Sequence, residues 1–258
     1  MSVCFRTRAL AAFIITIAVV SGWILFGRRN PRDPLQSLPP IIVWAWERPE
    51  NLGFLNPAEA AVAYLDRTIV LRGEVVEVRP RLQPVRLPPR AMVIGVARVE
   101  TESPALSPSQ QTDTVSALAR MAEQPGLSGI QIDFDAAISE RRFYRKVLEE
   151  LRQRLPPRLP LSITALASWC LDDNWLAGLP IDEAVPMLFR MGPDDRHIRT
   201  LLRGGREFTE QACRHSTGVS TDEPFPPLRR DRRVYVFHSR PWTQPAWETI
   251  VRRVKSWQ

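Results

Sequence analysis

Short apolar runs alternate with stretches of helical periodicity along most of the chain. The run Ile41–Trp46 is continuously apolar, which is typical of a strand buried on both faces. Between Ser139 and Leu155, by contrast, Phe143, Val147 and Leu151 recur at the spacing of one helix face. The pattern therefore predicts a protein that mixes buried strands with amphipathic helices.

The same pattern predicts about eight strands with helices between most of them. Strands are expected at 41–46, 67–78, 92–99, 129–134, 161–167, 183–189, 216–221 and 234–238. Helices are expected at 56–66, 107–124, 139–155, 173–179, 194–204 and 245–257. Alternation of this kind favours an α/β fold, a parallel (β/α)8 TIM-like barrel.

Two features qualify this prediction. The connection 222–233 contains three prolines and no helical period, so we expect the barrel to be trimmed at one crossover. An open doubly wound sheet is the alternative fold. It usually carries a glycine-rich phosphate turn, and the sequence has no G-x-G-x-x-G or Walker-type loop.

The N-terminal region has the character of a membrane anchor. Ala9–Gly27 is 19 residues without a charge, enough to cross a hydrocarbon layer of ~30 Å as a helix, and Arg28 and Arg29 follow at once. A cleaved signal peptide is the alternative, although its apolar region is usually shorter and a clean A-x-A site is missing. We expect a single-pass protein of the bacterial inner membrane with its folded domain outside the cytoplasm, or a secreted protein if the segment is cleaved.

The chain is accordingly predicted to have three parts. Residues 1–29 form the anchor, and residues 30–40, with four prolines, form a stiff linker. Residues 41–258 form the barrel domain. Nothing in the sequence indicates the oligomeric state.

The net charge supports the same division. The chain has 35 Lys and Arg against 28 Asp and Glu, but residues 1–32 hold five of the arginines and no acid. The remainder is nearly balanced, so the basic excess indicates membrane attachment, and we expect no nucleic-acid partner. Cys170 and Cys213 could pair in an oxidising compartment or remain two buried free thiols.

Acids and tryptophans recur where the predicted strands end, which is where barrel active sites lie. Asp133 and Asp135 stand two residues apart, so their side chains point the same way, and crowded carboxyl groups raise one another's pKa. We predict these two as the catalytic pair. The predicted binding residues are Trp46, Glu47, Glu100, Trp169, Arg190, Asp222, Glu223 and Trp242, with Trp46, Trp169 and Trp242 as a platform for sugar rings. No metal or cofactor is expected, because the three histidines lack ligand spacing.

Ser128–Asp135 (SGIQIDFD) resembles the fourth-strand motif D-G-x-D-x-D-x-E of the family 18 glycoside hydrolases, the chitinase-like barrels. Val185-Pro186-Met187 is similar to that family's sixth strand and Trp242 to its eighth-strand tryptophan. The match is closer to a bacterial family classed as domain of unknown function 3142. Its hallmark stretches look like IQIDFDA, LSITALASWC and PMLFRMG here.

The resemblance implies a barrel with the proton-donating position at Asp135. In the chitinase pattern that position is a Glu, and the first and middle acids are replaced here by Ser128 and Gln131. Family 18 enzymes use the acetamido group of the substrate as nucleophile. The sequence therefore predicts a glycoside-hydrolase-like protein that acts on or binds an envelope polysaccharide. The alternative is a non-catalytic carbohydrate-binding or assembly protein on a degenerate barrel.

Overall fold

The computed structural model describes residues 35–226 and 229–256. The chain divides into two compact units, Met1–Gln36 and Ser37–Gln258, and every element below belongs to the second. The predicted membrane segment Ala9–Gly27 lies outside the described residues. Within the residues that are described, no helix is long and apolar enough to cross a membrane.

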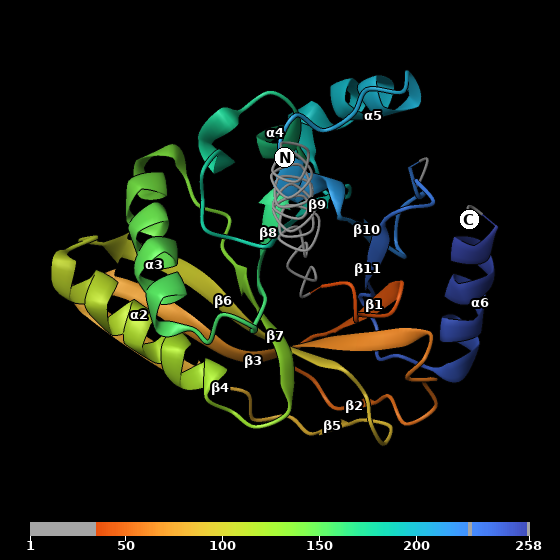
Figure 1. Cartoon of the computed structure of the whole chain (residues 1–258), viewed down its shortest axis with the longest axis horizontal. Coiled ribbons are helices and arrows are strands. Elements are labelled where there is room, and N and C mark those ends of the chain that lie inside the picture. The colour runs from red at the N-terminus through yellow and green to blue at the C-terminus, as the bar shows by residue number, and fades with distance from the viewer. Residues whose placement is uncertain (1–34, 227–228, 257–258) are drawn as a thin grey trace, which may run out of the picture. The chain divides into compact units, whose positions relative to one another are not determined.

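The second unit is built on a closed barrel of eight parallel strands (Figure 1). They are β1 (Ile41–Ala45), β3 (Ala60–Gly73), β6 (Val93–Pro104), β7 (Leu127–Asp133), β8 (Leu161–Leu166), β9 (Glu183–Met187), β10 (Ser216–Ser220) and β11 (Arg233–Phe237). Because β1 pairs with both β3 and β11, the sheet closes on itself. The predicted barrel is confirmed, and the open-sheet alternative is wrong.

Strands β3 and β6 continue beyond the rim of the barrel. β1 pairs with the first part of β3, and β4 (Val75–Pro80) then pairs antiparallel with the second part. The turn between β3 and β4 places Gly73 at φ +50°, a left-handed conformation that glycine adopts without strain. A three-stranded extension of the sheet, which no part of the sequence pattern predicted, therefore projects from the barrel.

The predicted helix 56–66 is wrong, since its second half forms the start of β3. Asn56 caps only a turn, in which its Oδ1 accepts a hydrogen bond from the Ala58 amide at 3.1 Å. Residues Ala60–Ala63 are fully buried between β1 and β6. Alanine favours helices in isolation, but the pairing of β3 along both edges overrides that preference.

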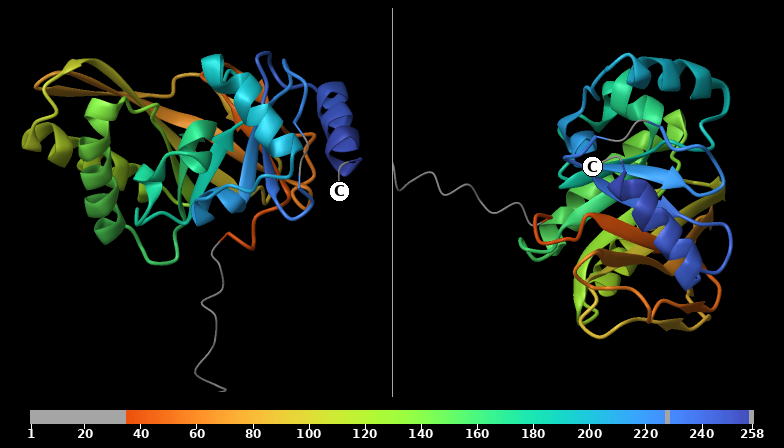
Figure 2. Two further views of the ribbon diagram at one scale, coloured as in Figure 1. Left: turned by 90° about the horizontal axis from the view of Figure 1, so that it is seen from above. Right: turned by 90° about the vertical axis from the view of Figure 1, so that its right-hand side faces the viewer.

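Helices cover the outside of the barrel unevenly. They are α2 (Pro108–Ala122), α3 (Arg141–Arg154), α4 (Ala167–Leu171), α5 (Asp195–Arg203) and α6 (Gln244–Lys255), with 3₁₀ turns at Ile138–Glu140, Asn174–Leu176, Gly192–Asp194 and Gln211–Arg214. Figure 2 shows α2 and α3 at one end of this unit and α6 at the other.

Trimming of the barrel goes further than the single crossover predicted. In the described residues, the connections after β1, β3 and β10 all lack an α-helix. Two short strands, β2 (Glu50–Asn51) and β5 (Val85–Arg86), pair across the first two of these connections. These two strands form a small second sheet, which stands in these connections where a (β/α)8 barrel would have helices.

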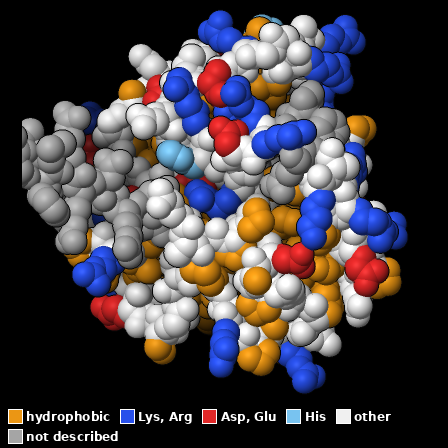
Figure 3. All heavy atoms as spheres, turned by 45° about the vertical axis from the view of Figure 1, so that its right-hand side comes forward, with side chains coloured by type: hydrophobic (Ala, Val, Ile, Leu, Met, Phe, Trp, Pro, Cys, Tyr) orange, Lys and Arg blue, Asp and Glu red, His pale blue; other side chains and the backbone are white. Residues whose placement is uncertain are grey.

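Some charged side chains on the surface lie in opposite-charge pairs. Arg72 pairs with Glu102 on the sheet extension, and Lys255 pairs with Glu59 at 2.9 Å. On the face drawn in Figure 3, Lys and Arg side chains are spread out, with Asp and Glu between them. This arrangement agrees with the near balance of charge in residues 33–258.

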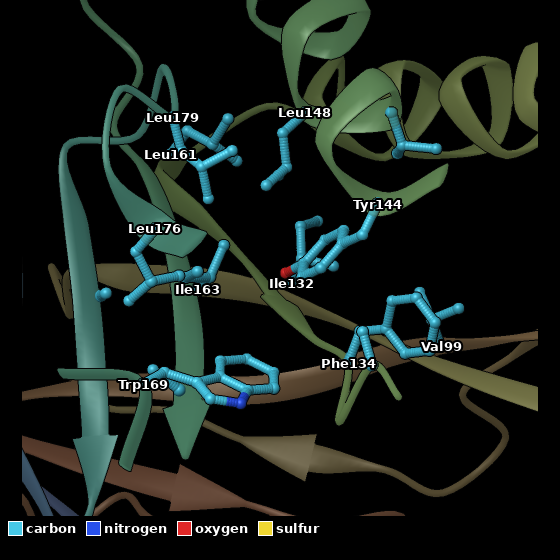
Figure 4. Close-up of a cluster of buried hydrophobic side chains, with 14 of the residues drawn as sticks. Val99, Ile132, Phe134, Tyr144, Leu148, Leu161, Ile163, Trp169, Leu176 and Leu179 are labelled. Carbon is cyan, nitrogen blue, oxygen red and sulfur yellow. The ribbon is translucent and has the colours of Figure 1, made fainter. Parts of the chain in front are cut away.

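The hydrophobic core lies between the barrel and its helices, in two clusters. The larger is formed by β7 and β8 with α2, α3 and α4, and Figure 4 shows Tyr144, Leu148 and Trp169 directed into it. The smaller lies between β1, β11 and α6. A disulfide joins Cys170 of α4 to Cys213, so of the two alternatives for these cysteines the structure has the paired one.

Candidate functional site

A hollow opens at the C-terminal ends of the barrel strands, as expected for this fold. Its first cavity has a volume of about 230 Å³. The polar side chains that line it are Arg98, Asp133, Asp135, Ser168, Arg190 and Asp194, and the apolar ones include Trp46, Leu166, Met187, Phe189 and Phe237. Residues from the ends of β1, β6, β7, β8, β9 and β11 thus meet in one place.

Asp133 is the last residue of β7 and points into the barrel mouth at only 5% exposure. Its Oδ1 accepts a hydrogen bond from the Thr164 hydroxyl at 2.7 Å, and its Oδ2 accepts one from the Arg98 guanidinium at 2.9 Å. Arg98 also donates to Glu100 Oε1 at 2.8 Å. Asp133 is therefore a carboxylate whose two oxygens are already held by the protein.

Asp135 lies two residues further on and is exposed to solvent from the cavity wall. Its carboxyl group has no hydrogen bond or ion pair with any described residue. Burial among the cavity walls raises its pKa, the negative charge of Asp133 adds to the rise, and Arg98 opposes it. Asp135 therefore keeps its proton to higher pH than an ordinary aspartate and can donate it to a ligand.

Aromatic rings form one wall of the hollow. Trp46 follows β1 and is half-buried, with its ring centroid 6.5 Å from that of Phe237 at the end of β11. The Phe189 ring lies 4.8 Å from Phe237 on the other side. Flat apolar faces of this kind can pack against the carbon-bound faces of a sugar ring while nearby polar groups take its hydroxyls.

The wall is held from inside the barrel by a buried polar network. The indole of Trp44, whose ring centroid lies 4.4 Å from that of Trp46, donates to Gln131 Oε1 at 2.9 Å. Gln131 in turn donates to the Ser162 hydroxyl at 3.1 Å. An amide both accepts and donates, which an ionised carboxylate cannot. Gln131 thus does structural work at the position where the chitinase-like pattern has its middle acid.

A second cavity, of about 270 Å³, adjoins the first. The two share Trp46, Phe189, Arg190 and Phe237, and the second adds Arg48, Ser220, Asp222, His238 and Ser239. Asp222 accepts a hydrogen bond from the Ser239 hydroxyl at 2.8 Å. Burial lowers the pKa of His238, partly offset by Asp222, so its imidazole is neutral near pH 7. The aromatic wall therefore separates two lobes of one cleft.

The structure brings together five of the ten predicted site residues. Asp133, Asp135, Trp46 and Arg190 line the first cavity, and Asp222 lines the second beside Trp46 and Arg190. The other five line neither cavity. They are Glu47, Glu100, Trp169, Glu223 and Trp242.

Two of the three tryptophans predicted as a sugar platform are core residues instead. Trp169 is 2% exposed and packs edge-on against Trp175 under α4 (Figure 4). Trp242 is 4% exposed, and its indole donates to the Trp44 carbonyl at 3.0 Å. Neither offers a free ring face, so the platform prediction is corrected to Trp46 with Phe189. Phe237 is itself 5% exposed and supports these two rings by packing against both.

The predicted glutamates support the rim rather than line it. Glu47 Oε1 accepts hydrogen bonds from the backbone amides of Leu82 and Gln83, both at 3.0 Å. Glu100 pairs with Arg98, as described above, and Glu223 accepts from the Arg190 amide at 2.9 Å. Each acid fixes a neighbouring group instead of facing the hollow.

Sequence reasoning missed Arg98, Phe189, Phe237 and Asp194 as lining residues. Arg98 had a usable signal, because it lies near the end of the predicted strand 92–99, two residues before Glu100. Phe189 and Phe237 end strands as Trp46 does, but an apolar residue at a strand end reads as core. In the part of the chain that is described, no group of three or more His, Cys, Asp or Glu could hold a metal ion.

Comparisons with known proteins find a family model that is similar to part of the chain. Residues 88–188 match the family model described as Domain of unknown function (DUF3142). This stretch contains β6, β7, β8 and β9, and with them Asp133 and Asp135. It includes two of the three hallmark stretches of the sequence, and the third, Pro186–Gly192, extends past its end.

Among solved structures, the chain has a distant similarity to the crystal structure of the Bacillus cereus spore cortex-lytic enzyme SleL. The two chains share 14% identity with a TM-score of 0.44, over 71% of this chain and 52% of the other. This chain thus spans about half the length of that structure. The search of curated proteins finds no match.

Proposed function

We propose that the barrel binds a carbohydrate polymer in this cleft and hydrolyses a glycosidic bond with Asp135 as the general acid. The observation that carries the proposal is the carboxyl group of Asp135, which has a raised pKa, no protein partner among the described residues and an aromatic wall across the same cavity. A proton donor must be free to reach the glycosidic oxygen and must hold its proton at the working pH. Asp135 is free of protein partners, and its raised pKa favours the protonated form.

The neighbouring groups have supporting roles in this proposal. Asp133, held by Thr164 and Arg98, places a fixed negative charge behind Asp135 and sustains its raised pKa. By the resemblance to the chitinase-like barrels, the nucleophile is the acetamido oxygen of the substrate, which bonds to the anomeric carbon as Asp135 gives its proton to the departing glycosidic oxygen. Water then adds to the anomeric carbon, the bond to the acetamido oxygen breaks, and the water proton passes to the Asp135 carboxylate, which restores the acid.

The proposed substrate class is suggested by the resemblance to the chitinase-like barrels and by the apolar N-terminal segment. We propose an envelope polysaccharide, met outside the cytoplasm by a domain anchored to the membrane. The disulfide between Cys170 and Cys213 supports that location, because such bonds persist in oxidising compartments.

The test compares the wild-type protein with Asp135→Asn on a panel of bacterial envelope glycans, with release of reducing ends as the measurement. We expect the variant to lose about 10²-fold or more of the activity, the usual contribution of a general acid. Asp113→Asn is the matched control, because Asp113 is an exposed aspartate on α2 that lines neither cavity. Undiminished release by Asp135→Asn would contradict the proposed role.

The pH dependence gives a second readout for the same group. The acid form of Asp135 is required, so activity falls as pH rises through its pKa. Since that pKa is raised, the alkaline limb of the profile lies above the ordinary aspartate range of ~4. A limb at the ordinary position would mean that another group donates the proton.

A non-catalytic sugar binder is the second candidate. It is favoured by the fact that Asp133 is already occupied by Arg98 and Thr164, which leaves Asp135 without a second free carboxylate on the same strand. Calorimetry on the same glycan panel separates the two. A binder shows affinity that Trp46→Ala weakens, with no reducing ends released by the wild-type protein.

A further inference from the structure

Arg190 occupies an unusual position between the two lobes of the cleft. It is the one basic residue that lines both cavities. Its backbone has φ +50°, a strained conformation for a residue with a Cβ. Such strain persists only where the surroundings hold the residue in place.

The surroundings do hold it. The Arg190 amide donates to Glu223 Oε1 at 2.9 Å, and Glu223 Oε2 accepts from the Arg199 guanidinium at 3.0 Å. Arg199 is itself fixed by Asp195 at 2.8 Å within α5. A chain of charged contacts from α5 and from the loop after β10 therefore fixes the backbone from which the Arg190 side chain projects.

The guanidinium of Arg190, in contrast, has no hydrogen bond or ion pair with any described residue. The other two arginines of the cleft are fully engaged. Arg98 binds Asp133 and Glu100, and Arg48 donates to the carbonyl oxygens of His238, Ser239 and Arg240 and to Glu50. Arg190 thus combines a fixed backbone with a guanidinium that is free to bind a ligand.

The acids of the cleft decide on which side an anion can be accepted. The first cavity is lined by Asp133, Asp135 and Asp194 against Arg98 and Arg190, so even with Asp135 protonated its acids balance its arginines. The second cavity is lined by one acid, Asp222, against Arg48 and Arg190, so its balance of charge favours an anion. That cavity also presents the neutral imidazole of His238 and the Ser220 side chain, both able to hydrogen-bond a ligand oxygen.

We propose that the second cavity is a subsite for an acidic substituent of the glycan, a carboxylate or a phosphate, which the free guanidinium of Arg190 binds. The inference rests on the proposed function and makes it more specific, because the substrate becomes an anionic polysaccharide. The sugar ring that bears the acid packs against the aromatic wall of Trp46, Phe189 and Phe237. Arginine suits this task, since its planar fork binds carboxylate and phosphate with two parallel hydrogen bonds.

The experiment measures binding of the full chain to matched pairs of oligosaccharides by calorimetry. One pair is an oligouronide and its carboxyl-reduced neutral form, and the other is a phosphorylated oligosaccharide and its dephosphorylated form. We expect the acidic member of one pair to bind about 10- to 100-fold more tightly than its neutral member, as for a charged hydrogen bond. The pair that shows the preference identifies the acid.

Arg190→Gln is expected to remove this preference, so that the acidic and neutral members of the pair bind the variant with similar affinity. Arg190→Lys, which keeps the charge but not the fork, is expected to keep part of it. Arg196→Gln is the control, because Arg196 is an exposed arginine of α5 that lines neither cavity and its loss changes the net charge equally. Thermal unfolding of each variant shows whether it is folded.

The outcomes separate this inference from the proposed function. Equal affinity for acidic and neutral members, or a preference that survives Arg190→Gln, overturns the subsite and leaves the glycan-binding cleft standing. A preference that Arg196→Gln also removes would reflect net charge and would equally overturn it. If no member of either pair binds and no panel glycan is bound or cleaved, the cleft proposal and the subsite both fail.

Discussion

Arg98 holds Asp133, one of the two aspartates of the proposed catalytic pair, in place. It lies opposite Asp133 in the register of β6 and β7, and its guanidinium joins Asp133 to Glu100. Asp133 is 5% exposed, so loss of its cationic partner would leave a nearly buried carboxylate with the Thr164 hydroxyl as its remaining partner. Breaking a buried pair on one side is costly, because the other charge stays desolvated.

We therefore expect Arg98→Met to lower the free energy of unfolding by about 2 kcal/mol, less than for a fully buried pair because Arg98 is partly exposed. Glu100→Gln is the control, since it removes the more exposed contact of the same arginine and should cost about 0.5 kcal/mol or less. Urea unfolding followed by tryptophan fluorescence measures both. Equal effects of the two variants would show that Asp133 does not depend on Arg98.

Among the elements, those with a strong local signal were predicted and those defined by pairing partners were not. α3 was predicted because its apolar stripe repeats at 3.6 residues, and β7 and β8 because each is a short apolar run before a polar residue. The start of β3 was predicted as a helix, since Asn56-Pro57 and the alanines after it are local helix signals. Only the pairing with β1 and β6, which is set by distant parts of the chain, makes it a strand.

At the scale of elements, the disulfide ties the short helix α4 to the turn Gln211–Arg214. It closes a loop with a sequence separation of 43 residues, which in the chain-entropy model stabilises the fold by ~4 kcal/mol. α4 begins with Ala167 and Ser168, which line the first cavity, so the bond also restrains one wall of the cleft.

We expect Cys170→Ser with Cys213→Ser to lower the free energy of unfolding by about 2–5 kcal/mol. The comparison is with Cys4→Ser, which removes the third cysteine and leaves the bond intact. Thermal unfolding with and without reductant measures the effect. We expect the reductant to lower the Tm of the wild-type protein and of Cys4→Ser but not that of the double variant. An unchanged Tm in all three proteins would contradict the prediction.

For the molecule as a whole, the barrel was predictable because alternation of strands and helices is a property of the entire pattern and tolerates one wrong element. The cleft was predictable only in part. Asp133 and Asp135 are two residues apart in the sequence, so their closeness could be predicted from it. Trp46, Phe189 and Phe237, in contrast, meet only because the barrel closes β1 onto β11. Trp169 and Trp242 show the converse, since residue type and strand-end position do not reveal whether a ring faces the cleft or the core.

The location of the whole molecule rests on Ala9–Gly27, whose 19 uncharged residues are the basis for a proposed membrane anchor. An arginine at the centre of such a segment costs about 2.5–3.5 kcal/mol on insertion. We therefore expect the wild-type chain, produced in bacteria, to stay in the membrane fraction after carbonate extraction, and Val19→Arg to move a large share into the soluble fraction. Val19→Leu, which keeps the segment apolar, should behave as the wild type.

The state of the cysteines reports which side of the membrane the barrel occupies. If the barrel lies outside the cytoplasm, Cys170 and Cys213 of the wild-type protein are joined in the disulfide and do not react with thiol reagents in intact cells. The Val19→Arg protein that stays soluble in the cytoplasm keeps both thiols reduced, so they react once the protein is denatured. A shorter, soluble wild-type product would instead mean that the segment is cleaved as a signal. A membrane-bound chain whose two cysteines react would place the barrel in the cytoplasm, away from any envelope polysaccharide, and would contradict the proposed substrate together with the proposed topology.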